Sequence, residues 1–244
     1  MILNRYDEKL AGVYDQMYPI QPDTDAAVDF LVDLCPPEGT VLELGVGTGR
    51  VAIPLSRRGL KVFGIDASEA MLDELRRRDP DGAVVAELGD YMEVGTGRQH
   101  DLITMLLNTF YTAVTKEQQV GVLKLVREQL TPGGRFVVEA FDPADFHAMR
   151  DPHTSVRLLG DESVMLDNLV VDRSQQIMLG SHTILDGGRP HTTRHVVRYV
   201  FPAELDLLGE LAGLRRVDRF GHWDRSPYHA GSSRYISVFV RDDN

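Results

Sequence analysis

Cysteine is almost absent from this chain. Cys35 is the single cysteine in 244 residues, so no internal disulfide can form and no cysteine-based metal site is available. Long apolar runs are also missing: the N-terminus has no apolar signal core, and the longest apolar stretches, at about six residues, are far too short to span a membrane. These absences predict a soluble, cytoplasmic protein without a membrane partner.

Positive charge is in deficit as well. The formal net charge is −11 at pH 7, whereas a protein that binds nucleic acid is expected to carry a basic patch or stripe. Apolar residues make up 43% and charged residues 26% of the chain, which is ordinary for a globular protein. We therefore expect residues 1–244 to form one domain with no nucleic-acid partner, as a monomer or a homodimer.

A glycine-rich stretch, V-L-E-L-G-V-G-T-G-R, occupies residues 41–50. Its first four residues predict a short buried strand that carries one acidic residue, Glu43. Gly45, Gly47 and Gly49 follow at alternate positions, and a helix is expected to begin near residue 48 or 49. Because glycine has no Cβ, such a turn lets backbone N–H groups approach a ligand closely.

Two cofactors are compatible with this turn. Gly47, Gly49 and Ala52 match the dinucleotide fingerprint, which would make the protein an NAD-dependent oxidoreductase. The alternative pattern starts earlier, at Glu43-x-Gly45, and places a carboxylate within the strand itself. The motifs further along the chain have to decide between the two.

Asp66 ends the second predicted strand, residues 60–65, and follows Gly45 by 21 positions. That spacing is the length of one helix and one strand. A carboxylate at the tip of this strand can accept hydrogen bonds from both hydroxyls of an adenosine ribose. Ser68 is then expected to cap the next helix, whose buried face includes Met71.

Four further motifs follow in order. A short strand at residues 83–86 precedes Asp90-Tyr91-Met92, and a strand at residues 100–107 ends in the polar and aromatic cluster N-T-F-Y at 108–111. Thr115 and Gln118 predict a capping box for the next helix. The turn L-T-P-G-G at 130–134 then leads into a strand at 135–141.

Together these motifs, over residues 38–141, resemble class I S-adenosylmethionine (SAM)-dependent methyltransferases. The resemblance implies an α/β fold: a Rossmann-like, seven-stranded, doubly wound sheet whose last strand is antiparallel. It also implies SAM as cofactor and S-adenosylhomocysteine (SAH) as product. In this family an acidic residue in the position of Asp90 accepts from the adenine amino group, and a backbone carbonyl near Leu106 receives the SAM ammonium. The expected cofactor-binding residues are Tyr14, Glu43, Gly45, Gly47, Gly49, Arg50, Asp66, Ala67, Met71, Asp90, Tyr91, Met92 and Leu106.

Two segments of the chain are expected to cover the site. Residues 1–37 predict an N-terminal helical lid, with a first helix ending before Pro19 and a second opening at residue 23 or 24. Tyr14 and Tyr18 are candidates to face the cofactor pocket, although each is equally consistent with a core aromatic. Residues 142–201 predict a β-rich insert above the substrate, with antiparallel strands from residue 169 onward. A helix from Pro202 and two final strands, 214–220 and 234–240, complete the prediction.

Methyl transfer mainly requires alignment of acceptor and methyl group, and a general base is needed only if the acceptor arrives protonated. The catalytic candidates are His182 and His195 in the insert, and Asn108 and Tyr111 on the floor of the chamber. The substrate-binding candidates are Tyr18, Arg173, Arg194, Arg198, Trp223 and Tyr228. Core histidines, solvated arginines and aromatic residues that cover a sheet edge produce the same patterns. No cluster of metal ligands is apparent.

The stretch N-T-F-Y…L-T-P-G-G…D-P-A-D-F is similar to that of peptide N-terminal methyltransferases, the group of the cypemycin enzyme. We therefore expect a methyltransferase that acts on a small molecule or short peptide, at an amine nitrogen of a secondary metabolite. Methylation of oxygen or carbon remains an alternative. An NAD-dependent oxidoreductase and a non-catalytic SAM-binding protein also stay open.

Overall fold

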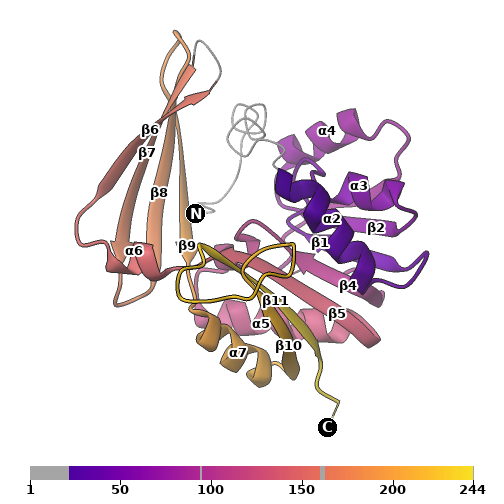
Figure 1. Ribbon diagram of the computed structural model, residues 1–244. Helices are drawn as coiled ribbons and strands as arrows, with labels where there is room; N and C mark the ends of the chain where they lie inside the picture. Colours follow the sequence, from indigo (N-terminus) through magenta and orange to yellow (C-terminus); the bar gives the residue numbers. More distant parts are fainter. Residues whose placement is uncertain (1–21, 94, 160–162, 244) are drawn as a thin grey trace.

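The computed structural model describes residues 22–93, 95–159 and 163–243 (Figure 1). The first predicted helix, with Tyr14 and Tyr18, therefore lies outside the described residues. The described part contains a seven-stranded sheet and a four-stranded sheet. None of its helices is long and apolar enough to cross a membrane.

The seven-stranded sheet has the order β10-β11-β5-β4-β1-β2-β3. Its strands are β1 (Thr40–Leu44), β2 (Lys61–Asp66), β3 (Val84–Leu88), β4 (His100–Met105), β5 (Leu130–Phe141), β10 (Leu214–Phe220) and β11 (Arg234–Arg241). Strands β1 to β5 pair in parallel, and β11 is antiparallel to both β5 and β10. The predicted doubly wound sheet with an antiparallel last strand is thus confirmed.

Helices cover both faces of this sheet. On one face lie α2 (Pro22–Leu34), α3 (Ala52–Arg57) and α4 (Glu69–Arg78), and on the other α5 (Lys116–Gln129), α7 (Pro202–Leu211) and the 3₁₀ turn η1 (Thr109–Thr112). Neighbouring strand residues therefore enter different cores: Val41 packs beneath the first layer and Leu42 beneath the second. Burial on both faces explains why these strands read as continuous apolar runs.

Helix α3 begins at Ala52, later than the expected residue 48 or 49. The reason is the backbone of the preceding glycines, since Gly45, Gly47 and Gly49 have φ angles of 75°, 55° and 79°. This left-handed region cannot continue into a right-handed helix. The turn is therefore longer than the sequence suggested, and the helix is only six residues long.

Both predicted helix caps are present. The Ser68 side chain accepts from the backbone N–H of Met71, and Thr115 forms a capping box with Gln118. Strand β5 is longer than expected because it starts at Leu130, so the Pro-Gly-Gly segment belongs to the strand and not to a separate turn.

The predicted lid is only partly described. Helix α2 packs on the face of the sheet beside α3, and Phe30 contacts the rings of Phe220 and Trp223. Its first turn reaches the carboxyl edge of the sheet, where Asp23 forms an ion pair with Arg234 at 2.7 Å. The expected helical lid over the ligand site stays a prediction.

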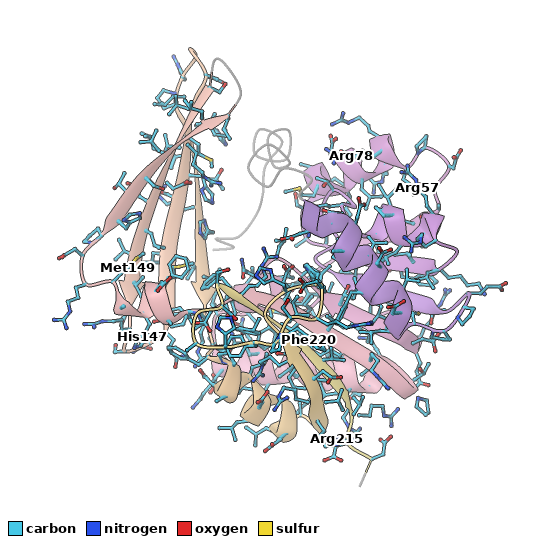
Figure 2. The ribbon with its side chains drawn as sticks, in the orientation of Figure 1. Arg57, Arg78, His147, Met149, Arg215 and Phe220 are labelled. Carbon is cyan, nitrogen blue, oxygen red and sulfur yellow. The ribbon has the colours of Figure 1, made fainter. Side chains whose placement is uncertain are left out.

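The four-stranded sheet stands beside the first one (Figure 1) and lies between β5 and α7 in the chain. It is antiparallel, in the order β6 (His153–Leu159), β7 (Ser163–Asp172), β8 (Ile177–Leu185) and β9 (His191–Arg198). The expected β-rich insert is present, but β6 was not predicted and β7 begins six residues earlier than expected. Figure 2 shows His147 and Met149 at α6 (Ala144–Ala148) below this sheet.

Candidate functional site

A cavity of about 110 Å³ lies at the carboxyl ends of β1 and β2, against the glycine turn. Its lining residues come from the turn, the end of β2 with the start of α4, and the segments after β3 and β4, namely Gly45, Gly47, Asp66, Ala67, Ser68, Met71, Tyr91, Leu107, Thr109 and Thr112. Six of these ten were predicted to bind the cofactor. Open α/β sheets bind ligands at this edge, where the strand order reverses.

The three glycines have different reasons to be glycine. A Cβ on Gly45 would stand 2.5 Å from the Thr109 side chain, and one on Gly49 would stand 2.8 Å from Ile53. A Cβ on Gly47 would meet no atom within 4 Å. Gly45 and Gly49 thus permit close protein packing, whereas Gly47 faces open space that a ligand can enter.

Asp66 stands at the tip of β2 and holds the turn. Its Oδ2 accepts from the Gly47 N–H at 2.8 Å, and its Oδ1 accepts from the Ser68 N–H at 2.9 Å. Burial raises the pKa of Asp66, and the backbone hydrogen bonds oppose that rise. Because each carboxylate oxygen has two lone pairs, the side chain keeps capacity for further donors such as ribose hydroxyls.

Glu43 and Arg50 lie behind the turn and do not line the cavity. Glu43 is almost completely buried, and burial raises its pKa to about 8 although the charge of Arg50 opposes this. Within the described residues, Oε2 of Glu43 has no hydrogen-bond partner. Arg50 donates to the Thr24 hydroxyl in α2 at 2.9 Å. Direct contact of either residue with a cofactor stays a prediction.

The segment after β3 closes one side of the cavity. Tyr91 lines it and is hydrogen bonded through its hydroxyl to the carbonyl of Thr109 and the hydroxyl of Thr112. Asp90 does not line the cavity, and its Oδ1 accepts from the N–H of Met92 at 2.9 Å. The predicted adenine contacts of Asp90 and Met92 therefore remain predictions.

Leu106 is buried in the core at the end of β4, and its carbonyl accepts two hydrogen bonds from Thr109. The carbonyl expected to receive the SAM ammonium is thus already used within the protein. The next residue, Leu107, lines the cavity and has a φ angle of 46°, in the left-handed region that is rare outside glycine. Such strain is typical of functional sites.

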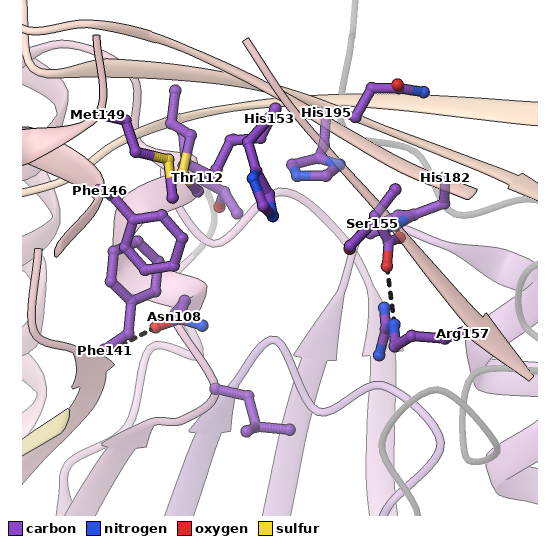
Figure 3. Close-up of a pocket in the computed structure, with 17 residues that line it drawn as sticks. Asn108, Thr112, Phe141, Phe146, Met149, His153, Ser155, Arg157, His182 and His195 are labelled. Atoms are coloured by element: carbon purple, nitrogen blue, oxygen red, sulfur yellow. Dashed lines mark hydrogen bonds and ion pairs between the residues drawn. The ribbon is translucent and has the colours of Figure 1, made fainter. Parts of the chain in front are cut away.

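A second, larger cavity of about 480 Å³ lies between this edge and the four-stranded sheet (Figure 3). The two cavities adjoin, since Leu107 and Thr112 line both. One wall is apolar and is built by Phe141, Phe146, Met149, Leu169, Met178 and Val197. The polar lining residues are His153, Ser155, Arg157, Asp167, His182 and His195, all on the four-stranded sheet.

His182 lines the larger cavity and is held by a carboxylate. Its Nδ1 lies 2.5 Å from Oδ1 of Asp167, while Nε of Arg157 donates to Oδ2 of the same carboxylate at 2.7 Å. Burial raises the pKa of Asp167, but the bonds from Arg157 and His182 outweigh this and hold it below its usual range. Asp167 is therefore a carboxylate that orients the imidazole.

His195 lines the same wall and stacks on His182, with ring centroids 4.8 Å apart and ring planes at 21°. Burial, and secondarily the proximity of His182, lowers the pKa of His195 to about 4. At neutral pH His195 is uncharged. The two predicted histidines are thus in contact, although 13 residues separate them in sequence.

The floor of the chamber contains Asn108 but not Tyr111. Asn108 lines the larger cavity, and its Oδ1 accepts from the Phe141 N–H at 2.7 Å. Tyr111 is fully buried, and its hydroxyl is bonded to the carbonyls of Phe141 and Val200 and to the hydroxyl of Tyr235. The predicted position of Tyr111 facing the substrate is wrong because this ring is turned into the core.

The three predicted arginines do not line the larger cavity. Arg198 bridges Gln119 and Glu204, Arg194 is exposed, and Arg173 belongs to an open depression beside His147. The arginine that does line it is Arg157, in the strand that the sequence analysis missed. His153, Ser155 and Arg157 share one face of β6 because they are two positions apart. Sequence alternation would have turned the apolar Val156 and Leu158 inward instead, although both are exposed.

The two predicted aromatic substrate contacts are also placed elsewhere. Trp223 is 5% exposed and packs against Phe30 of α2, so it covers the sheet. Tyr228 donates a short hydrogen bond to Asp142, and burial followed by this bond raises its pKa to about 12. Neither residue lines the larger cavity.

Comparison with known proteins identifies related enzymes. A methyltransferase-domain family model matches residues 41–134. The cypemycin N-terminal methyltransferase of a Streptomyces species is 30% identical over 97% of both chains, and an amino-sugar N,N-dimethyltransferase of Streptomyces venezuelae is 25% identical over 86% of this chain and 92% of its own. The crystallised methyltransferase CcbJ of Streptomyces caelestis is 33% identical, with a TM-score of 0.89 over 97% of this chain and 99% of its own. These matches overturn the NAD-dependent alternative.

Proposed function

The chain belongs to the SAM-dependent methyltransferases, and on that premise we propose that it methylates an amine nitrogen of a small secondary metabolite or a short peptide. The observation that carries this proposal is the His182–Asp167 pair, which faces a cavity adjoining the glycine turn. Two of the relatives are named for methylation of a peptide N-terminus and of an amino sugar. The absence of described membrane-spanning helices and the free Cys35 are compatible with a cytoplasmic reaction.

The smaller cavity fits the cofactor. Gly47 leaves open space, and the Asp66 carboxylate reaches the same cavity. We propose that Asp66 accepts from the ribose hydroxyls and that Ala67, Met71 and Tyr91 enclose the adenosine. When bound, SAM supplies a methyl group that is already activated on a sulfonium.

The larger cavity suits an amine. At neutral pH an aliphatic amine arrives as an ammonium ion, so one proton must leave before its nitrogen has a lone pair to attack. Because Nδ1 of His182 is engaged by Asp167, Nε2 is the nitrogen that can take this proton. The proton moves from the acceptor nitrogen to Nε2, and the negative charge of Asp167 stabilises the imidazolium that forms. Asn108 and the apolar wall of Phe141 and Phe146 position the acceptor and exclude water.

Transfer of an isotopically labelled methyl group tests the proposal. The purified protein is incubated with methyl-labelled SAM and with glucosamine, trialanine, N-acetyl-trialanine or a simple phenol. We expect label on the nitrogen of at least one free amine and none on the acetylated peptide, as located by mass spectrometry and NMR. Label only on oxygen or carbon would support the O- or C-methyltransferase alternative. If the protein binds SAH but transfers no labelled methyl group, either to these probes or to a cell extract that contains amines, a non-catalytic SAM-binding protein would be supported.

Two variants assign the roles of the residues. Asp66→Asn should weaken SAH binding about tenfold in calorimetry, because an amide accepts through one oxygen where the carboxylate accepts through two. Asp73→Asn, an exposed position of α4, is the matched control and should leave the affinity unchanged. His182→Gln should bind SAH normally and lose about 100-fold in turnover, the usual contribution of a general base.

A further inference from the structure

Two pairs of directly opposed residues lie side by side on the cavity face of the four-stranded sheet. Asp167 of β7 is opposite His182 of β8, and Gly180 of β8 is opposite His195 of β9. Since opposed residues share a face, and residues two apart on a strand share it as well, all four point toward the cavity. All four line it (Figure 3).

Gly180 is glycine because a ring occupies its side-chain space. A Cβ at this position would stand 2.1 Å from Nε2 and 2.2 Å from Cε1 of the His195 imidazole. Its backbone is not among the positive-φ glycines, so the conformation itself does not require glycine. The His195 ring therefore lies across the Gly180 backbone, and this position seats it against His182.

Asp167 acts on the other end of His182. It accepts from Nδ1–H, which leaves the lone pair of the neutral imidazole on Nε2. Arg157 holds the second oxygen of the carboxylate and thereby limits its rotation. Across the sheet, the Arg157 guanidinium is thus followed by the Asp167 carboxylate, the His182 imidazole and the His195 imidazole.

We infer that Asp167 and Gly180 are positioning residues for proton removal from the acceptor: Asp167 sets the tautomer of His182, and Gly180 seats His195 as a neutral ring against it. This inference rests on the proposed function, since it names residues that act through the proposed base. The stack holds one proton and not two, because two imidazolium rings with centroids 4.8 Å apart would repel each other. His182, next to the carboxylate, receives that proton.

The charges around the stack agree with this assignment. The titratable or charged groups that line the wall are His153 and Arg157 on β6, Asp167 on β7, His182 on β8 and His195 on β9. Burial lowers the pKa of His195 to about 4, so the ring is neutral at pH 7. Of the two stacked histidines, His182 is the one that is hydrogen bonded to the Asp167 carboxylate.

The first test reads the tautomer by ¹⁵N NMR of the full chain saturated with SAH at pH 7.5, with no acceptor present. We expect the His182 resonances, identified by their loss in His182→Gln, to show a proton on Nδ1. In Asp167→Asn the amide can donate to Nδ1, so the proton should move to Nε2. Asp172→Asn, an exposed carboxylate of the same strand bonded to Ser174, is the matched control and should change nothing. An Nε2–H tautomer in the unaltered protein overturns the inference.

The second test is Gly180→Ala, compared with Gly121→Ala in α5, where a new Cβ meets no atom within 4 Å. Gly180→Ala should displace His195, so that its ring begins to titrate near the ordinary value of about 6.5. Gly121→Ala should leave this titration unchanged. An unchanged His195 titration in Gly180→Ala would overturn the role of Gly180.

If Gly180→Ala fails to fold, the double variant Gly180→Ala/His195→Ala decides the question. Removal of the ring removes the clash, so the double variant should regain folding if His195 is what excludes a side chain at position 180. Continued failure to fold would contradict the steric explanation.

Kinetics then connect the stack to methyl transfer, on whichever amine probe accepts the label. Asp167→Asn should lower kcat about 100-fold and Gly180→Ala about tenfold, with KM and SAH affinity within about twofold. Rescue of part of the loss by Asp167→Glu would support a positioning role. A loss confined to KM would contradict it. The NMR experiments contain no acceptor, so their outcome does not depend on the proposed function. If the tautomer is as expected but no amine is methylated, the proposed function is contradicted and the positioning role of Asp167 is not.

Discussion

The two sheets of this protein build their sites in different ways. The seven-stranded sheet is buried on both faces, and its cavity is formed where the chain leaves the strands, in part by backbone groups of the glycine turn. The four-stranded sheet turns one face toward the larger cavity, whereas its other face exposes Val156 (62%) and Leu158 (78%). Its site consists of side chains that meet across strands.

This difference indicates where the cofactor half (the seven-stranded sheet) and the substrate half (the four-stranded sheet) are each sensitive to substitution. In the first half, a side chain that enters the turn blocks the space intended for the cofactor, whatever its polarity. In the second half, the backbone is a regular sheet, and the chemistry depends on which side chains face inward and what they contact. Variants of the first half should therefore change cofactor affinity, and variants of the second should change turnover.

The largest expected effect comes from Gly47→Ala, compared with Gly82→Ala. Both glycines have positive φ, at 55° and 64°, and neither would bring a Cβ within 4 Å of another atom. Each variant should cost stability of about 1 kcal/mol for the left-handed conformation. Only Gly47→Ala should weaken SAH binding in calorimetry, by about 30-fold to 100-fold or roughly 2–3 kcal/mol. Equal SAH affinity in the two variants would show that the cofactor does not approach this turn.

The pH dependence of stability compares two histidines, the buried His100 of the seven-stranded sheet and the partly buried His195 of the four-stranded sheet. Burial lowers the pKa values of His100 in β4 and His195 in β9 to about 4, whereas an unfolded chain has about 6.5. The unfolded state therefore binds more protons below pH 6.5, and stability is lost as pH falls from 6.5 toward 4. Between pH 6.5 and 5 each histidine should contribute about 2 kcal/mol to this loss.

Urea unfolding of His100→Gln and His195→Gln across that pH range checks the expectation. Each variant should show a shallower decline than the unaltered protein, because one group no longer takes up a proton on unfolding. If the four-stranded sheet unfolds on its own, only His195→Gln should change its transition. If stability in both variants declined as steeply with falling pH as in the unaltered protein, the lowered pKa values of the two rings would be contradicted.

Tyr111→Phe tests the core position of a residue first expected at the substrate. The hydroxyl has three hydrogen-bond partners in the core, so its loss should lower the unfolding free energy by about 1–2 kcal/mol. SAH affinity, kcat and KM should stay within about twofold. Tyr228→Phe, which loses one bond to Asp142, should cost less stability. A fall in kcat without a loss of stability would return Tyr111 to the active site.

The smallest effects distinguish two arginines of the four-stranded sheet. Arg198→Ala removes contacts with Gln119 and Glu204 and should cost about 1 kcal/mol of stability without a kinetic change. Arg157→Ala frees the carboxylate of Asp167 and should lower kcat about threefold, or roughly 0.7 kcal/mol, a value in the general range for a single hydrogen bond. Steady-state kinetics beside thermal unfolding separate these outcomes. The reverse pattern would favour Arg198 as the substrate contact.

Local patterns were enough to predict much of the cofactor half. Gly47 and Asp66 lie in the same cavity because a strand, a turn and a helix of fixed length bring the tips of neighbouring parallel strands together. The Ser68 cap was predictable for the same reason, since a cap depends only on residues three positions away. The length of the turn was not predicted. The positive φ angles of Gly45, Gly47 and Gly49 delay the start of the helix.

The substrate half was harder to predict because its contacts are not local. His182 and His195 were chosen as histidines in roof strands, but their stacking depends on the register of β8 and β9. Asp167 and Arg157 come from β7 and β6, and nothing in their own neighbourhoods marks them as partners of His182. Tyr111 and Arg198 were misplaced because an alternating polar or aromatic pattern does not say which face of an element is turned inward.

By itself, the sequence determined the strand–turn–helix units, the position of the cofactor turn and the acidic tip of β2, since each depends on residues a few positions apart or on the length of one repeating unit. Only the tertiary structure decided which side chains form the substrate wall, and that the His195 ring fills the side-chain space at position 180. The physical reason is register: the four-stranded sheet brings residues 10 to 15 positions apart into contact at this site, and only the pairing of whole strands determines which ones meet.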